Sequence, residues 1–84
     1  MTTVEKPASG RAIVYTHPEC GYCDLLKEDL IVKKVEFDEI DVSKQPQYWA
    51  EIEKLCGGDR ITPVMVTGDG KVEIGYNGIG CNFN

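Results

Sequence analysis

The first half of the chain alternates between short apolar strands and an amphipathic helix. Residues 12–15 are apolar and rich in β-forming side chains, which predicts a buried strand from about Arg11 to Thr16. The next 12 or so residues, about Tyr22 to Lys33, are expected to form a helix, because apolar residues recur at helical spacing there: Leu25, Leu26, Leu30 and Ile31. A second strand is predicted from about Glu36 to Asp41, although Glu39 breaks its alternation.

The second half starts with another helix and ends in turns. Pro46 is favoured at a first helical position and Gly57-Gly58 ends the helix, whose apolar face comprises Tyr48, Trp49, Ile52, Leu55 and Cys56. Residues 61–67 form a β-prone run that contains Pro63. Because proline cannot donate a hydrogen bond inside a sheet, we expect Pro63 to open this strand. The Gly-Asp-Gly sequence at 68–70 then predicts a hairpin and a returning strand at 72–74.

The order of these elements, β-α-β-α-β-β, indicates an α/β protein with a mixed sheet. Helical crossovers join a parallel first half, and a hairpin adds antiparallel strands. Residues 11–84 are expected to form a single domain. Residues 1–10 are polar, show no period, and are predicted to be a flexible leader.

Composition and charge narrow the range of partners and compartments. The chain has 84 residues, a net charge of −5 and a pI near 4.7, which argues against nucleic acid or an anionic membrane as a partner. No apolar run approaches the roughly 20 residues of a membrane span, and the first ten residues lack the apolar core of a secretory signal. We therefore expect a cytoplasmic monomer.

Four cysteines in a reducing compartment indicate catalysis or metal binding more than a structural framework. Cys20 and Cys23 follow a strand and open a helix, whose free N–H groups and partial positive charge favour a thiolate. Cys20 is thus the candidate nucleophile and Cys23 its resolving partner, the alternative being an inert buried pair. A zinc site is disfavoured, because there is no second Cys-x-x-Cys.

The two other cysteines have less defined roles. Cys56 lies on the apolar face of the second helix, which indicates a core residue, with a regulatory thiol as the alternative. Cys81 stands near the end of the sequence. It could remain free, or form a second disulfide with Cys56 or with a partner chain.

Three features together resemble a glutaredoxin of the thioredoxin fold. They are Cys20-Gly21-Tyr22-Cys23 after a strand, Thr62-Pro63 before another strand, and a glycine-rich turn after the hairpin. The resemblance covers about residues 11–80. It implies a four-stranded mixed sheet and a short or vestigial C-terminal helix, since only residues 79–84 remain to build that helix.

The resemblance also implies roles for individual residues. Cys20 would attack a disulfide and Cys23 would resolve the mixed disulfide. The Thr62-Pro63 bond would be cis, so that the Thr62 backbone pairs with the cysteine of glutathione as a short antiparallel strand. Tyr22 would flank the active-site groove.

Two substrate-binding positions differ from the usual glutaredoxin pattern. His17 stands where many members have a lysine, and would hold a glutathione carboxylate less firmly. The usual Gly-Gly-Asp appears as Gly75, Tyr76 and Asn77, without an acid. An aromatic residue after the first glycine resembles the pattern of one group of glutaredoxin-like redoxins. Members of that group serve ribonucleotide reductase and draw electrons from thioredoxin reductase.

The resemblance leaves two functional classes open. The first is a thiol–disulfide oxidoreductase that transfers electrons to protein disulfides or glutathione mixed disulfides, with glutathione or thioredoxin reductase as electron source. The second is a [2Fe–2S] module in which Cys20 and glutathione hold a cluster between two chains. Gly21 resembles the Cys-Gly-Phe-Ser members that bind clusters, whereas Cys23 in place of serine favours redox chemistry.

Overall fold

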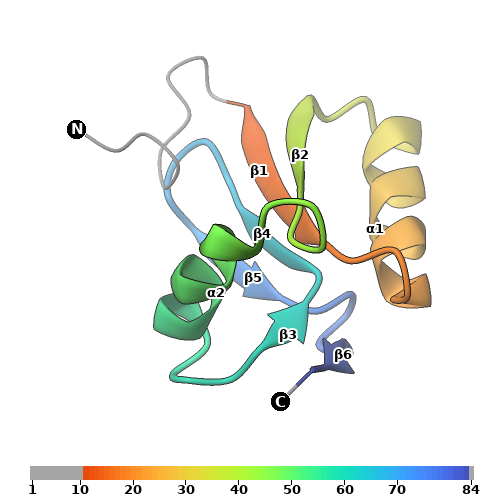
Figure 1. The fold of residues 1–84 in the computed structure, drawn as a ribbon. Coiled ribbons are helices and arrows are strands. Elements are labelled where there is room, and N and C mark those ends of the chain that lie inside the picture. Colours follow the sequence, from red (N-terminus) through yellow and green to blue (C-terminus); the bar gives the residue numbers. More distant parts are fainter. Residues whose placement is uncertain (1–10, 84) are drawn as a thin grey trace.

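A computed structural model describes residues 11–83 and contains two α-helices, one short 3-10 helix and six strands in that range (Figure 1). In chain order the elements are β1 (Ala12–Thr16), α1 (Gly21–Val32), β2 (Phe37–Asp41), η1 (Pro46–Tyr48), α2 (Trp49–Leu55), β3 (Ile61–Thr62), β4 (Val64–Val66), β5 (Val72–Ile74) and β6 (Cys81–Asn82). The leader predicted at residues 1–10 lies outside the described residues.

The central sheet is four-stranded and mixed, with the order β2-β1-β4-β5. β1 pairs in parallel with β2, and antiparallel pairing joins β1 to β4 and β4 to β5. Tyr15 shows the register at the centre of the sheet, since it lies opposite Ile40 on one side and Val64 on the other. This arrangement confirms the mixed thioredoxin-like α/β fold.

β1 supplies both layers of the core, because all five of its residues are buried. Ile13 and Tyr15 pack with Ile52 of α2, whereas Ala12 and Val14 pack with Leu26 and Leu30 of α1. The two helices therefore cover opposite faces of the sheet (Figure 1). Strand alternation in β1 decides which side chain meets which helix.

Glu39 explains the broken alternation of β2. Its carboxylate accepts hydrogen bonds from the Thr16 hydroxyl at 2.7 Å and from the Lys27 ammonium of α1 at 2.9 Å. Burial raises the pKa of Glu39, but these two partners outweigh that effect, and the net pKa is lowered. An acidic residue therefore sits where alternation predicts an apolar one, because it ties β1 and β2 to α1.

We expect Glu39→Gln to lower the free energy of unfolding by roughly 0.5–1 kcal/mol at pH 7, the usual range for a partly exposed ion pair. A carboxyl whose folded pKa lies below its unfolded value stabilises the fold above the unfolded pKa and loses that contribution as pH falls through the folded pKa. Urea unfolding at several pH values should show the difference between wild type and variant shrinking from pH 7 toward pH 3. A difference that stays constant with pH would contradict this assignment.

The β-prone run around Pro63 divides between two sheets. β4 begins directly after Pro63, as predicted, and continues the central sheet. Ile61 and Thr62 instead form β3, which pairs antiparallel with β6 in a second, two-stranded sheet. The Thr62-Pro63 peptide bond is cis, as the resemblance implied.

The short C-terminal helix expected from the resemblance is absent from the described residues. Residues 79–83 contain no helix, and Cys81–Asn82 form strand β6. Gly78 has a φ of +81°, unfavourable for a helix, and Phe83 N–H donates to the Arg60 carbonyl 2.7 Å away, so the segment extends along β3.

One part of the central sheet is left open. A hollow of about 410 Å³ lies on the side of the sheet that α1 covers. Its lining includes Leu30, Met65, Glu73 and Tyr76.

The described residues contain no helix that is both long and apolar enough to cross a membrane.

Candidate active site

Cys20 lies where the sequence predicted it, at the N-terminus of α1. It is the residue before the helix and has an extended backbone (φ −106°, ψ 107°), while Cys23 falls in the first turn. The Cys20 N–H donates to the His17 carbonyl at 3.0 Å, and the Cys23 N–H donates to the Cys20 carbonyl at 3.1 Å. The loop is therefore closed by its own backbone and presents Cys20 at the positive end of the helix dipole.

The cis-proline loop lies against Cys20. The Cys20 Sγ is 3.4 Å from the Thr62 carbonyl oxygen, although 42 positions separate the two residues. The Gly75 N–H donates to the Pro63 carbonyl at 2.7 Å. The structure thus brings together Cys20, Thr62, Pro63 and Gly75, four of the residues named from the sequence.

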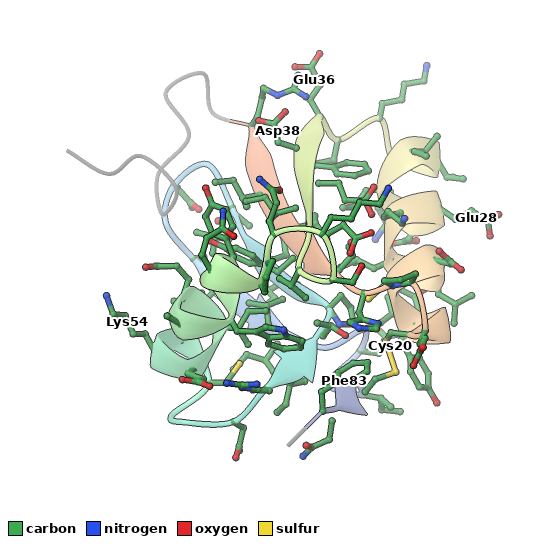
Figure 2. The ribbon with its side chains drawn as sticks, in the orientation of Figure 1. Cys20, Glu28, Glu36, Asp38, Lys54 and Phe83 are labelled. Carbon is green, nitrogen blue, oxygen red and sulfur yellow. A yellow bond between two sulfur atoms is a disulfide. The ribbon has the colours of Figure 1, made fainter. Side chains whose placement is uncertain are left out.

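The sulfur partner of Cys20 is Cys81, not Cys23. The two residues form a disulfide with a Cα–Cα distance of 5.8 Å across 61 positions, and Figure 2 shows the sulfur–sulfur bond beside the label of Cys20. Cys56 stays free, so the pairing of Cys81 with Cys56 considered from the sequence is wrong. No pattern in the sequence predicts that β6 returns to the start of α1.

The disulfide closes the nucleophile off from solvent. Cys20 is only 1% exposed, with its sulfur bonded to Cys81 and lying against the Thr62 carbonyl. Attack on an external disulfide therefore requires that the bond to Cys81 first be reduced.

Cys23 is a free and buried thiol. Its side chain is also 1% exposed. Burial raises the pKa of Cys23 and outweighs the opposing effects of the His17 backbone, the Thr62 side chain and the Lys27 charge. Since the thiolate is the reactive form, a raised pKa and burial both make Cys23 a slow nucleophile in this state.

An aromatic cluster flanks the disulfide. The His17 ring lies 4.3 Å from the Phe83 ring between centroids, and the Trp49 ring lies 5.7 Å from Phe83. The Arg60 guanidinium stands 5.5 Å from the centroid of Trp49. Figure 2 shows Phe83 beside Cys20 at the lower end of the molecule.

This cluster gives Trp49 and His17 contacts that were not predicted from the sequence. Trp49 packs against the core, as expected, and also reaches the C-terminal segment. His17, predicted to meet a glutathione carboxylate, has its Nδ1 accepting a hydrogen bond from the Glu19 N–H at 3.1 Å and its ring against Phe83. Phe83 was missed, and its only signal is an aromatic residue two positions after a cysteine.

The remaining predicted residues lie in two places, at the start of α1 and in the turn after β5. Tyr22 is 37% exposed in the first turn of α1, consistent with a place at the rim. Gly75 has a φ of +80°, and a Cβ there would lie 2.8 Å from the Ile79 backbone, so only glycine fits. Tyr76 packs against the α1-side core and, with Asn77, lines the 410 Å³ hollow.

Comparison with known proteins identifies the family. The Glutaredoxin family model matches residues 12–72, which is most of the chain and includes both motifs. The chain belongs to the glutaredoxin family. Membership supports a role as a thiol–disulfide oxidoreductase.

Individual relatives agree with this assignment. The chain is 32% identical over 57 residues to a Mycobacterium tuberculosis protein provisionally named a glutaredoxin, over 68% of each chain. It is 32% identical over 63 residues to the gene 56 protein of Mycobacterium phage L5, covering 75% of this chain and 60% of that protein. The match therefore spans less than two thirds of the phage protein.

Two solved glutaredoxin structures share the fold. The crystal structure of a glutaredoxin from Archaeoglobus fulgidus has a TM-score of 0.71 and 25% identity, covering 84% of this chain and 80% of its own. The solution structure of the Brucella melitensis glutaredoxin has a TM-score of 0.66 and 34% identity, covering 86% and 77%.

A [2Fe–2S] cluster would require the reduced form of the site. The Cys20 sulfur, its expected ligand, is already bonded to Cys81. Within residues 11–83, no group of three or more His, Cys, Asp or Glu side chains is placed to hold a metal ion, but the predicted cluster would need only Cys20 from each chain together with glutathione.

Proposed function

We propose that this glutaredoxin reduces protein disulfides or glutathione mixed disulfides, with Cys20 as the attacking thiolate. The observation that carries the proposal is the position of the Cys20 sulfur, at the start of α1 and 3.4 Å from the Thr62 carbonyl of the cis-proline loop. The helix N-terminus favours the thiolate, and the loop offers backbone groups to a substrate cysteine. The sequence predicts Cys23 as the resolving partner, and the proposed function holds whichever thiol resolves the mixed disulfide.

The chemistry requires the reduced protein. The Cys20 thiolate attacks one sulfur of the substrate disulfide, the sulfur–sulfur bond of the substrate breaks, and one substrate thiolate leaves. The other substrate half remains on Cys20 as a mixed disulfide until a second thiol of the protein or of glutathione attacks Cys20. Overall, two electrons pass from the two attacking thiols to the substrate disulfide.

The electron source follows from how glutathione would be held. The position of the usual lysine is occupied by His17, whose ring packs on Phe83, and the turn at Gly75 carries Asn77 where an acid is usual. Both differences should weaken binding of the two ends of glutathione. We therefore propose thioredoxin reductase as an electron donor alongside glutathione, for a glutaredoxin that acts in the cytoplasm as a monomer.

The experiment is a turnover assay of the purified full chain on a small disulfide, with two donor systems run in parallel. One system is glutathione with glutathione reductase, and the other is thioredoxin reductase, each coupled to NADPH oxidation. We expect turnover with thioredoxin reductase to exceed that with glutathione. Turnover in neither system would contradict the proposed function.

The same preparation tests the [2Fe–2S] alternative. No contact of the described residues favours a cluster, so protein purified without oxygen and with glutathione present should be colourless. Visible absorbance of an iron–sulfur cluster, lost on Cys20→Ser substitution, would favour the alternative.

A further inference from the structure

The C-terminal segment occupies the edge of the protein where the proposed substrate would bind. β6 pairs antiparallel with β3, with Cys81 opposite Thr62 and Asn82 opposite Ile61. The Phe83 N–H extends this pairing by donating to the Arg60 carbonyl at 2.7 Å. The backbone of Thr62 is thus engaged by a cysteine of the same chain.

The sulfur of that cysteine is bonded to the nucleophile. Cys81 therefore makes both contacts expected of a substrate cysteine, a disulfide to Cys20 and strand pairing to Thr62. The Cα–Cα distance of 5.8 Å lies within the usual range for disulfides. Strand pairing and the disulfide support each other, because each holds the other in register.

Two further contacts hold the segment in place. Phe83 lies on the His17 ring, with Trp49 on another side, so the aromatic cluster anchors the residue that follows β6. Gly80 brings the chain so close to β3 that a Cβ would lie 2.7 Å from the Thr62 carbonyl oxygen. A side chain at position 80 would therefore push β6 away from Thr62.

We propose that Cys81 is the second redox-active cysteine of this protein and resolves the mixed disulfide on Cys20 by replacing the substrate cysteine on the Thr62 edge. This inference rests on the proposed function and assigns its second step to the C-terminal segment. Cys23 is poorly placed to compete, since it is buried beneath the loop and remains free while Cys20 is bonded to Cys81. Cys81, by contrast, is partly exposed at the surface.

The electron balance is that of two successive thiol–disulfide exchanges. The Cys20 thiolate first forms a mixed disulfide with one half of the substrate and releases the other half as a thiolate. The Cys81 thiolate then attacks the Cys20 sulfur, the bond from Cys20 to the substrate breaks, and the second substrate thiolate leaves. The two leaving thiolates take up the protons given up by Cys20 and Cys81. An external dithiol, or two molecules of a monothiol, restores the reduced protein.

The consequence is a self-closing oxidised form. Once the Cys20–Cys81 disulfide has formed, β6 covers the Thr62 edge and Cys20 is 1% exposed, so a second substrate cannot enter. The pairing of β6 with β3 also displaces the first substrate. Product release and closure are then one event.

The test follows the mixed disulfide directly. Reduced full-length protein is mixed with glutathione disulfide, free thiols are blocked with N-ethylmaleimide at set times, and intact mass and tryptic peptides are measured. Trypsin places Cys20 and Cys23 together in the peptide of residues 12–27 and Cys81 in residues 72–84. A Cys20–Cys81 bond therefore joins two peptides, whereas a Cys20–Cys23 bond closes a loop within one.

We expect the wild type to yield the joined peptides, with Cys23 and Cys56 alkylated. Cys81→Ser should accumulate the glutathione adduct on Cys20 to several times the wild-type level at matched time, because the thiol proposed to release the adduct has been removed. Cys23→Ser should behave as wild type. Cys56→Ser is the matched control, because Cys56 is a free cysteine at the C-terminal end of the other helix.

A second variant tests the pairing of β6 with β3 independently of the Cys81 thiol. Gly80→Ala keeps Cys81 but places a Cβ against the Thr62 carbonyl, so the adduct should accumulate here also. The inference is overturned if the wild type forms the loop within 12–27, or if Cys23→Ser accumulates the adduct and Cys81→Ser does not. Those results would leave the proposed function intact. The proposed function fails instead if a Cys20→Ser, Cys81→Ser double variant forms as much adduct as Cys81→Ser.

Discussion

Substitution of Cys20 by serine is expected to reduce turnover by roughly a hundredfold or more with either electron donor, because a serine hydroxyl cannot replace a thiolate as the attacking group. Both proposed steps pass through this sulfur, which attacks the substrate and then receives the attack of the second thiol. Neither of the two free cysteines can take its place. Cys23 is buried with a raised pKa, and Cys56 directly follows α2 and has its pKa also raised by burial.

Two other cysteine variants serve as controls for the Cys20→Ser result. Cys56→Ser removes a thiol outside the proposed site and should leave turnover unchanged. Cys23→Ser should retain its glutathione-dependent turnover, because Cys81 is proposed to resolve the mixed disulfide and glutathione itself can also release it. Circular dichroism of each variant in reducing buffer, where the wild type also lacks its disulfide, checks that the fold persists. Wild-type turnover by Cys20→Ser would show that the nucleophile is assigned wrongly.

The fold was predictable because its signals are local. Apolar runs, Gly57-Gly58 and Pro46 mark where strands and helices begin and end, and chain order then restricts the topology. Glu39 was the one disagreement within β2, and it proved to be paired with Thr16 and Lys27. A hydrogen bond between distant elements leaves no periodic mark in the sequence.

The centre of the site was also predictable, but what covers it was not. Cys20 and Thr62-Pro63 carry recognisable motifs, so their meeting across 42 positions could be expected from the family resemblance. Cys81 and Phe83 belong to no motif. Their positions depend on the turn at Gly75 and the close approach of Gly80 to β3, neither of which follows from apolar patterning.

The second large effect concerns stability and depends on Ile52. Its side chain is completely buried between α2 and the central sheet, where it packs with Ile13, Tyr15 and Val64. Ile52→Ala should lower the free energy of unfolding by about 2–5 kcal/mol, the usual cost of deleting a large buried aliphatic group. A domain of this size has a total stability of only about 5–10 kcal/mol, so the variant should be partly unfolded at moderate temperature.

Ile31 offers a matched comparison, because it is the same residue type on the other helix and is 66% exposed. Ile31→Ala should change the free energy of unfolding by less than about 0.5 kcal/mol. Both variants are unfolded with urea in reducing buffer, so that the Cys20–Cys81 disulfide contributes to neither value.

α2 has only seven residues and cannot hold its helical conformation without tertiary contacts. Loss of Ile52 should therefore release α2, and with it Trp49, which lies beside the ring of Phe83. Equal stability of the two variants would mean that α2 does not depend on its buried face, and the aromatic cluster would then have to be held by other contacts.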